Sequence, residues 1–566
     1  MLREIREVGK MFLLIKGKDK EAIRKRLKSE IINAKVFNTL KEIHGKSYEA
    51  FMMSKLVPVQ GDVCATNLGI DADTTNEIAK EIDVIINSAA NTIWDTRYDV
   101  AIDINTRGPA RVLEFGKEYC KKLKLFFHVS TAYVNGKRQG VILEKPFCME
   151  QSIATRDTIT SKTQAISVPF LDINAEIKLA SVAVESIEKN ADQIMSELGM
   201  ERARIHGWCS TYEMTKAMGE MLIHSMRLNI PTVIIRPSMI ESTYKEPFPG
   251  WIQGYKVPIL AAYGQGQLPG FVGDPITIVD IVPMDMVVNS TLTAIAKHGI
   301  AEKPELHVYH VATSVANPLS FSDSFNYAYD YFSSSPLFDS KGKKIAISPM
   351  KFFDSVDSFS DFIKNEVSQR SGLTPDHNVC MLDPKLYLRM QVGCFKAVQR
   401  FMRIANLYKS YMFYKGRFDV TNTKKLIEEM SIEEKKKFDF DMESINWEHY
   451  IKSVHIPGVR RHLLRQPLVA KLKSISATTT RIGGSFRVVS GGVCGPIGHA
   501  IGCSLVLPIG MANDVNFFIV TLVNNGFSGS SKCDLLGLFG MNPGCMAIPL
   551  LRRNGLISSS PARAAT

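Results

Sequence analysis

The segment "STYEMTKAMGE" (210–220) carries a tyrosine and a lysine, Tyr212 and Lys216, four positions apart. On a helix this spacing places the two side chains on one face, a turn apart. A lysine ammonium near a phenol favours the phenolate and so lowers the pKa of the phenol. The pair could therefore act as a general acid and the group that activates it. On a solvated helix the same spacing would have no chemical meaning. The neighbouring elements of the fold must therefore decide whether Tyr212 and Lys216 form an acid–base pair.

Two other places in the chain repeat this spacing, Tyr133/Lys137 and Tyr411/Lys415. The first pair is separated by Asn135-Gly136, a turn signal, so the two side chains need not share a helix face. The second pair lies in a helical region that offers no strand-end partner. Tyr212 and Lys216 are therefore the favoured pair, provided that a sheet brings a hydroxyl group beside them.

Short apolar runs alternate with amphipathic helical patterns over the first 345 residues. This alternation predicts an α/β fold, a Rossmann-like doubly wound parallel sheet whose strands are buried on both faces. The predicted strands are 11–15, 55–63, 83–91, 122–136, 231–237 and 305–313. The predicted helices are 19–32, 73–81, 98–122, 174–200 and the segment that carries Tyr212.

Polar and small residues follow four of these strands. Ligands of an open parallel sheet bind at the carboxyl ends of its strands, so we expect these residues to line a site. They are Lys16 and Lys18, Asp62, the segment "NSAAN" (87–91), and Ser130 with Thr131. Thr131 supplies the hydroxyl that the Tyr212/Lys216 pair requires.

Composition sets the domain organisation. The chain has 566 residues, 45% of them hydrophobic, which is enough for more than one core. We expect a nucleotide-binding reductase domain over 1–345, a helical domain over 346–465, and a Gly/Ser-rich basic tail over 466–566 that is disordered. The apolar window 501–523 contains Pro508, Asn513 and Asp514, which disfavours a membrane span. No His/Cys cluster has metal-ligand spacing, and no metal is predicted.

Basic charge is concentrated in the tail. The net charge is +12, and residues 466–566 hold eight Lys/Arg and two acids, which is +6. A solvated surface is the simpler interpretation, and attraction to anionic lipid or a phosphorylated ligand is the alternative. Nothing in the pattern points to a nucleic-acid partner.

The ordered set of motifs resembles a known family. The segments "NSAAN", "DINTRGP", "VSTAYVNG", "YEMTK" and "VIIRPSMI" together resemble the extended short-chain dehydrogenase/reductase superfamily. Further segments narrow the resemblance to the alcohol-forming fatty acyl-CoA reductases of plants, the male-sterility type. These are "LVPVQGDV", "EKPF", "EPFPGWIQG", "VDIVPMDMV", "KGRFDVTNTKKL" and "HIPG". The resemblance runs from about residue 8 to residue 465.

The resemblance implies a role for each residue at the predicted strand ends. Tyr212 would donate a proton to the reacting carbonyl oxygen, Lys216 would lower its pKa and bind the nicotinamide ribose, and Thr131 would hydrogen-bond the same oxygen. Ser130 is the runner-up to Thr131, and Asn105 is assigned a structural role. The implied cofactor-binding residues are Lys16, Asp62, Val63, Asn87, Ser88, Ala89, Ala90 and Lys216.

The implied reaction is the reduction of long-chain fatty acyl-CoA to primary alcohol and CoA through an aldehyde, in wax and lipid biosynthesis. A cation after the second strand of a nucleotide fold accommodates a 2′-phosphate, and Lys16 stands there, so NADPH is the expected cofactor. The endoplasmic reticulum membrane, on its cytosolic face, is the expected location, with the plastid as the alternative. The lipid-like substrate suggests peripheral membrane association, and the oligomeric state is left open.

One departure from the family leads to a different expectation. The family begins with a strand and a Gly-rich turn that cradles the pyrophosphate, and nothing like them precedes "MFLLIK" (11–16). Loss of that strand should expose the edges of its neighbours. The alternative function is therefore a truncated, catalytically inactive paralogue that at most binds acyl-CoA or partners. A sugar-nucleotide epimerase is a third reading, which the helical domain and the segment 137–208 disfavour.

Overall fold

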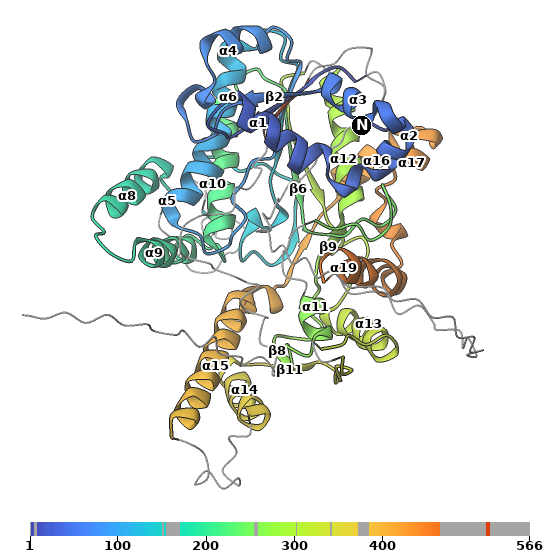
Figure 1. The fold of residues 1–566 in the computed structure, drawn as a ribbon. Helices are drawn as coiled ribbons and strands as arrows, with labels where there is room; N and C mark the ends of the chain where they lie inside the picture. The colour runs from blue at the N-terminus through green and yellow to red at the C-terminus, as the bar shows by residue number, and fades with distance from the viewer. Residues whose placement is uncertain are drawn as a thin grey trace, which may run out of the picture.

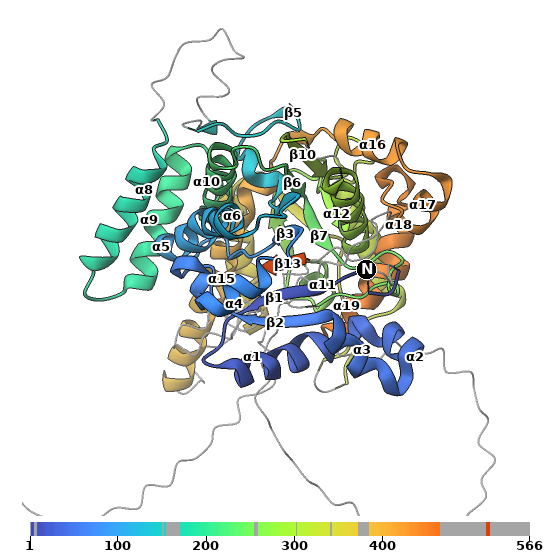
Figure 2. The ribbon, with the colours of Figure 1, turned by 90° about the horizontal axis from the view of Figure 1, so that it is seen from above.

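A seven-stranded, wholly parallel sheet forms the centre of the molecule (Figures 1 and 2). The computed structural model describes residues 2–4, 8–149, 152–153, 170–253, 259–300, 303–339, 342–371, 384–464 and 517–520. The strand order is β10-β6-β4-β3-β13-β1-β2. In that order the strands are Leu306–Val311, Thr232–Pro237, Leu125–Val129, Val84–Asn87, Phe517–Val520, Met11–Ile15 and Leu56–Gln60.

Alternate residues of each strand enter two separate cores, because successive side chains of a strand point to opposite faces. Along β1, Leu13 packs in the core shared with helix α12 (Met284–Gly299), whereas Phe12 and Leu14 pack in the core shared with α6 (Gly108–Tyr119). Figure 2 shows these two helices on opposite sides of the sheet. The near-continuous apolar runs of the sequence are thus explained by burial on both faces.

Six of the seven strands lie where the apolar runs predict them. The seventh, β13, comes from the tail that we expected to be disordered, and Figure 2 shows it between β1 and β3. It pairs in parallel with both neighbours. The expectation that these neighbours expose their edges is therefore wrong. The rest of 466–566, including most of the apolar window 501–523, lies outside the described residues.

The helices that precede and follow the first strands are close to prediction. Asp19 accepts a hydrogen bond from the backbone N–H of Ala22 at 2.7 Å and caps the predicted helix, which runs as α1 into a π-helical segment, η1. The bounds are α1 Lys20–Arg26, η1 Leu27–Ile32, α2 Asn38–His44, α3 Tyr48–Lys55, α4 Ala72–Ile78, α5 Tyr98–Ala101 and η5 Ile102–Arg107.

The single helix expected over 174–200 is wrong: the structure has two helices, α8 (Ile173–Glu185) and α9 (Ala191–Ile205). Residues 186–190 separate them, and Asn190, in the left-handed region with a φ of 58°, is the N-cap of α9. The next helix, α10 (Thr211–Met226), packs against α6, α9 and η5 and carries the Tyr212/Lys216 pair.

The helical region after residue 345 is joined to the rest of the fold by strands. β11 (Lys351–Phe353) pairs with β8 (Gly270–Val272), and β12 (Gly416–Phe418) pairs with β5 (Gly140–Ile142). The remaining strands, β7 (Met239–Glu241) and β9 (Ile281–Pro283), pair with each other. Residues 346–465 are therefore not a purely helical unit.

Two long helices of this region, α14 (Val356–Ser371) and α15 (Pro384–Met412), lie side by side and extend away from the sheet in Figure 1. The other helices are α11 Ile259–Gly264, α13 Phe321–Ser334, α16 Thr421–Glu428, α17 Ile432–Lys437, α18 Trp447–His449 and α19 Ile456–His462. Among the described residues, none of the helices combines the length and the apolar character that crossing a membrane requires.

Candidate active site at the carboxyl edge of the sheet

Helix α10 begins at the carboxyl edge of the sheet, where its first turn presents Tyr212. Ser210 caps the helix, and its hydroxyl accepts a hydrogen bond from the backbone N–H of Glu213 at 3.3 Å. The backbone N–H of Tyr212 donates to the carbonyl of Trp94 at 3.4 Å. The Tyr212 side chain is half-buried. A general acid that meets substrate requires such a position, accessible on one side and supported on the other.

A close approach between α10 and η5 fixes the height of this helix above the sheet. A Cβ added to Gly219 would lie 2.3 Å from the carbonyl oxygen of Asn105, so only glycine fits there. The buried Asn105 side chain donates to the carbonyl of Asn91 at 2.9 Å and to the hydroxyl of Thr215 at 3.1 Å. Asn105 therefore ties the segment after β3 to helix α10, in agreement with the structural role expected for it.

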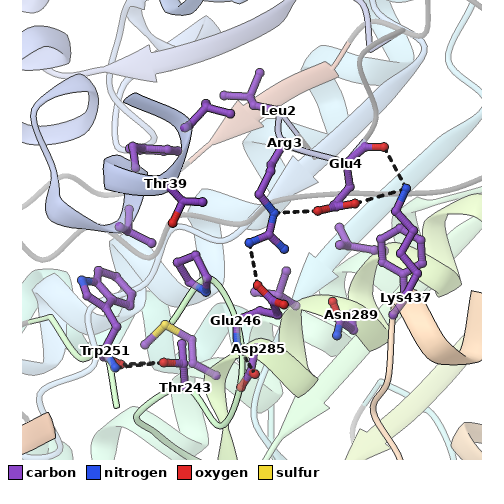
Figure 3. Close-up of a pocket in the computed structure, with 18 residues that line it drawn as sticks. Leu2, Arg3, Glu4, Thr39, Thr243, Glu246, Trp251, Asp285, Asn289 and Lys437 are labelled. Atoms are coloured by element: carbon purple, nitrogen blue, oxygen red, sulfur yellow. Dashed lines mark hydrogen bonds and ion pairs between the residues drawn. The ribbon is translucent and has the colours of Figure 1, made fainter. Parts of the chain in front are cut away.

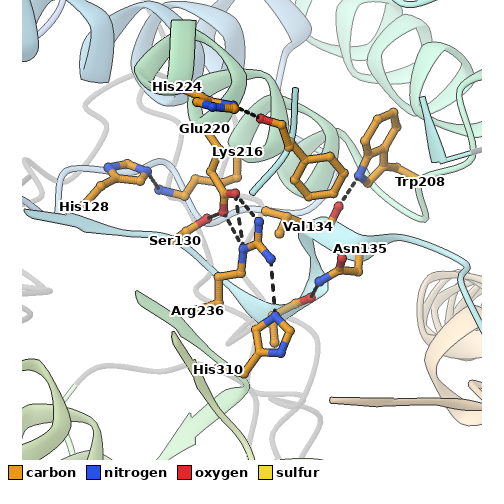
Figure 4. Close-up of polar contacts among 12 residues, drawn as sticks. His128, Ser130, Val134, Asn135, Trp208, Lys216, Glu220, His224, Arg236 and His310 are labelled. Atoms are coloured by element: carbon orange, nitrogen blue, oxygen red, sulfur yellow. Dashed lines mark hydrogen bonds and ion pairs between the residues drawn. The ribbon is translucent and has the colours of Figure 1, made fainter. Parts of the chain in front are cut away.

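Lys216 is buried, one turn beyond Tyr212, and its Nζ is held by neutral groups at the end of β4 (Figure 4). The ammonium donates to the carbonyl of Val129 at 2.7 Å and lies 3.1 Å from Nε2 of His128. Nδ1 of the same imidazole lies 3.2 Å from the amide nitrogen of Asn87. A chain of contacts thus connects Lys216 through β4 to the end of β3.

Burial sets the protonation states of Lys216 and His128. It lowers the pKa of Lys216 to about 8, against the opposing attraction of Glu220. Burial, and then the charge of Lys216, lower the pKa of His128 well below its usual value, so the imidazole is neutral. Lys216 is consequently a cation close to its titration point rather than a permanently charged group.

Thr131 and Ser130, the two hydroxyl candidates after β4, have different partners. Ser130 donates to the buried Glu220 carboxylate, which also forms a buried ion pair with Arg236 at 2.5 Å (Figure 4). Thr131 donates to the carbonyl of Pro237 at the long distance of 3.4 Å. The hydroxyl of Ser130 is committed to a buried carboxylate, so Thr131 is the better donor to a substrate oxygen.

The buried network of Ser130, Glu220 and Arg236 extends to the neighbouring strand β10. Arg236 lies over the ring of Phe147, with 5.2 Å from its guanidinium carbon to the ring centroid, and its Nη1 is 3.3 Å from Nε2 of His310. The backbone N–H of His310 donates to Glu144 at 2.7 Å. The "EKPF" motif therefore helps to hold Arg236 in place.

The structure separates the two rejected tyrosine–lysine pairs from Tyr212/Lys216. After Tyr133 the chain turns at Gly136, with a φ of 54°, so Lys137 leaves the helix η6 (Ala132–Asn135). The helix of Tyr411 ends at Met412, so Lys415 lies beyond it. Neither pair shares a helix face, whereas Tyr212 and Lys216 lie one turn apart in α10.

Tyr411 nevertheless has a place at the site, because it contacts helix α10, a contact that the sequence analysis did not predict. Its hydroxyl donates to the Glu213 carboxylate at 2.5 Å, and its ring centroid is 4.6 Å from that of Trp94. Burial raises the pKa of Glu213 to about 7, although hydrogen bonds from Tyr411 and Cys209 oppose the shift. Helix α15 thus braces the first turn of α10 directly beside Tyr212.

The other half of the edge, after β1 and β2, is charged and open. Lys16 and Asp62 form an ion pair with 2.6 Å between Nζ and Oδ2, and the Lys16 side chain is 63% exposed. The hydrogen bond to Asp62 raises the pKa of Lys16. Burial opposes ionisation of Asp62, but Lys16 and the N–H of Cys64 outweigh it and lower the pKa of Asp62. An exposed cation here can meet a phosphate.

The remaining predicted cofactor residues differ in what they expose. Val63 is 3% exposed and packs in the core, so its side chain has no free face for a ligand. Asn87 and Ala89 are also buried, and the side-chain Oδ1 of Asn87 accepts from the backbone N–H of Ala89 at 3.3 Å. Ser88 and Ala90 are half-buried and small, which leaves the backbone after β3 approachable.

A cavity of about 120 Å³ lies elsewhere, next to the N-terminal segment (Figure 3). The ion pairs Arg3–Glu246, at 2.6 Å, and Lys437–Glu4, at 3.2 Å, border it. Asp285 accepts hydrogen bonds from the backbone N–H groups of residues 244–246, and so joins the "VDIVPMDMV" and "EPFPGWIQG" motifs. The lining of this cavity includes none of the predicted site residues, and the contacts around it join separate segments of the structure.

The sequence analysis gave three residues no role at the site: His128, Glu213 and Tyr411. His128 could have been noticed as a histidine inside an apolar strand that ends at the reactive edge. Glu213 and Tyr411 are 198 positions apart, and neither carried a signal for the other. In the described part of the chain, no group of His, Cys, Asp and Glu side chains could hold a metal ion.

A doubly wound parallel sheet with Tyr212 and a buried Lys216 over its carboxyl edge defines a nicotinamide-dependent reductase of the short-chain dehydrogenase type. The family described as male sterility protein matches the chain in two parts, its NAD-binding part over residues 1–291 and its Sterile part over residues 385–466. The chain belongs to this family of fatty acyl-CoA reductases.

Two curated relatives illustrate the match. "Fatty acyl-CoA reductase 2, chloroplastic" of Arabidopsis thaliana is 52% identical over 472 residues, which cover 82% of this chain and 75% of the relative. "Alcohol-forming fatty acyl-CoA reductase" of Simmondsia chinensis is 36% identical over 481 residues, 82% of this chain and 93% of the relative. The terminal R domain of the myxalamid pathway gives a TM-score of 0.47 at 13% identity, covering 80% of this chain and 84% of that one.

Proposed function

We propose that the protein reduces long-chain fatty acyl-CoA to a primary alcohol and CoA, through an aldehyde, with NADPH as the reductant. The observation that carries the proposal is the buried Lys216, held against Val129 one turn from Tyr212 at the edge where Thr131 follows β4. The names of the relatives, one of them alcohol-forming, support the acyl-CoA substrate and the alcohol product.

The residues of the site suit this chemistry. The bound nicotinamide supplies hydride. Negative charge then develops on the carbonyl oxygen, where the hydroxyl of Thr131 stabilises it and the phenol of Tyr212 delivers a proton. Lys216, as an ammonium, lowers the pKa of that phenol and binds the nicotinamide ribose. The first reduction gives a hemithioacetal that expels CoA as aldehyde forms, and a second hydride and proton give the alcohol.

Lys16 supports NADPH over NADH. It follows β1, the strand next to the centre of the sheet, where a cation accommodates a 2′-phosphate. Its exposed side chain can turn from Asp62 to a phosphate, and the small Ser88 and Ala90 allow the cofactor to approach the backbone after β3. In this arrangement Asp62 lies beside the adenosine half of the cofactor.

A plastid location is part of the proposal, in place of the endoplasmic reticulum, because the 52% identical relative is named chloroplastic. The lipid-like substrate supports peripheral contact with a membrane and a role in wax or lipid synthesis. A fusion of the whole precursor to a fluorescent protein would test the location in leaf cells. Signal at the endoplasmic reticulum and none in plastids would contradict it.

The function is tested with purified protein, NADPH and acyl-CoA esters of graded length. Fatty alcohol is measured by gas chromatography, and NADPH consumption by absorbance. We expect two NADPH oxidised for each alcohol formed. Binding of acyl-CoA without alcohol would instead support the inactive paralogue. That alternative is not favoured, because Thr131, Tyr212 and Lys216 are all present and because β13 fills the central position of the sheet.

A further inference from the structure

The central strand of the sheet comes from the far end of the chain. β13 (Phe517–Val520) lies between β1 and β3 and pairs in parallel with each over all four of its residues. Ile519 stands opposite Leu13 on one side and Ile86 on the other, and Val520 stands opposite Leu14 and Asn87. The strand that separates the two halves of the sheet is thus about 430 residues away from β3 and about 500 residues away from β1 in sequence.

This position is the one at which a doubly wound sheet binds a dinucleotide. In the order 3-2-1-4-5-6 the two halves of the sheet diverge from strand 1, and the ligand lies in the crevice beyond the carboxyl ends of the strands there. Here β1 and β2 follow on one side of β13, and β3, β4, β6 and β10 on the other. β13 therefore occupies the strand 1 position, and its carboxyl end reaches the edge that bears Lys16 and Asn87.

The strand suits this environment. Its sequence, "FFIV", is apolar throughout, as a strand covered on both faces requires. Ile519 is 6% exposed and packs in the same core as Leu13 and Ile86. Without β13, the facing N–H and C=O groups of β1 and β3 would be buried without partners, at the centre of the sheet rather than at its rim.

We propose that the C-terminal strand β13 is an integral part of the cofactor-binding sheet, inserted between β1 and β3 of the same chain, and that dinucleotide binding requires it. The second clause rests on the proposed function, whereas the insertion itself does not. The segment that follows the helical region thereby acquires a role: it supplies the strand at the reversal point of the sheet.

Disulfide trapping in the full-length protein tests the insertion. Ile519→Cys with Ile86→Cys places two thiols at directly paired positions, about 5 Å apart between Cα atoms, within reach of a disulfide. Ile519→Cys with Val84→Cys is the matched control, because Val84 lies on the same strand and in the same core but pairs with Phe517. Its Cα lies about 8 Å from that of Ile519, beyond the reach of a disulfide.

After mild oxidation, peptide mass spectrometry should detect the 519–86 link in a monomeric band and no 519–84 link. The single variants identify any link to a native cysteine. Equal yields from the two pairs, or no 519–86 link, would overturn the insertion. A 519–86 link found only in dimers would assign the strand to a second copy and overturn insertion within one chain.

Whether cofactor binding requires β13 is tested by comparing Ile519→Asp, which buries a charge in the sheet, with Ile519→Val. NADPH fluorescence titration should give binding at least about ten-fold weaker for the first and within about two-fold of the unmodified protein for the second. Unchanged binding by Ile519→Asp would overturn the requirement while the function stands. If the unmodified protein binds no NADPH, the proposed function fails, and the disulfide result still decides the insertion.

Discussion

Two lysines mark the two halves of the carboxyl edge, and their surroundings shift their pKa values in opposite directions. Lys216, beside β4, is buried among neutral partners, and burial lowers its pKa to about 8. Lys16, beyond β1, is exposed and paired with Asp62, which raises its pKa. One side chain type thus serves two purposes. Burial brings the pKa of Lys216 close to the working pH, so this lysine can change its protonation state. Lys16 stays charged in a solvated ion pair, and it can exchange Asp62 for a phosphate.

The largest expected effect is on the buried side, at Tyr212. Tyr212→Phe removes the proton donor and should lower kcat about 10³-fold, with NADPH affinity unchanged. Alcohol formation by gas chromatography and NADPH binding by fluorescence measure the two quantities. Tyr327→Phe, in α13, is the matched control and should keep kcat within about two-fold. A Tyr212→Phe protein with near-normal kcat would remove Tyr212 from the mechanism.

Lys216→Met should have the next largest effect. We expect kcat to fall about 10²-fold, because the Tyr212 phenol loses its neighbouring charge. The unmodified protein should also lose activity as the pH rises through about 8, where the ammonium loses its proton. Initial rates between pH 6 and pH 10, with substrate and cofactor saturating, test both statements. The alkaline fall should be absent from the residual activity of Lys216→Met. If that variant retains it, the titrating group is not Lys216.

On the open side we expect a smaller, cofactor-specific effect. Lys16→Ala should raise KM for NADPH about ten-fold and leave kcat and the KM for NADH nearly unchanged, since only the 2′-phosphate loses a partner. Lys122→Ala, an exposed lysine just before the amino end of β4 and so at the opposite edge of the sheet, is the control. Equal loss with both cofactors would show that Lys16 does not discriminate between them.

The smallest effect on activity is expected where the helical region meets the buried side. Tyr411→Phe removes the donor to Oε1 of the Glu213 carboxylate, although the N–H of Cys209 still donates to Oε2, and should cost about 2 kcal/mol of unfolding free energy, because a buried acceptor atom loses a hydrogen bond. Urea denaturation measures this cost, and kcat should fall less than about three-fold. Glu213→Gln tests the same contact from the other side. If neither variant is destabilised, α15 does not brace α10.

Several features of the molecule follow from sequence reasoning alone. Apolar runs buried on both faces are a local property, and they located six strands and their parallel arrangement. Turn chemistry at Asn135-Gly136 excluded one tyrosine–lysine pair, and the strand context selected Tyr212 and Lys216. The motif order identified the family. The roles of the individual cofactor-binding residues stay predictions, because no ligand contact tests them.

Only the tertiary structure decided how the edge is assembled. The β13 insertion, the buried Glu220–Arg236 pair that engages Ser130, and the contact of Tyr411 with Glu213 each join segments that carry no signal for one another. The pKa of Lys216 also depends on the tertiary structure. The residues near it in sequence predict which face of the helix it occupies, but they do not predict that it is buried. Spacing and periodicity report contacts within a few residues, whereas desolvation and strand pairing depend on which distant segments the folded chain brings together.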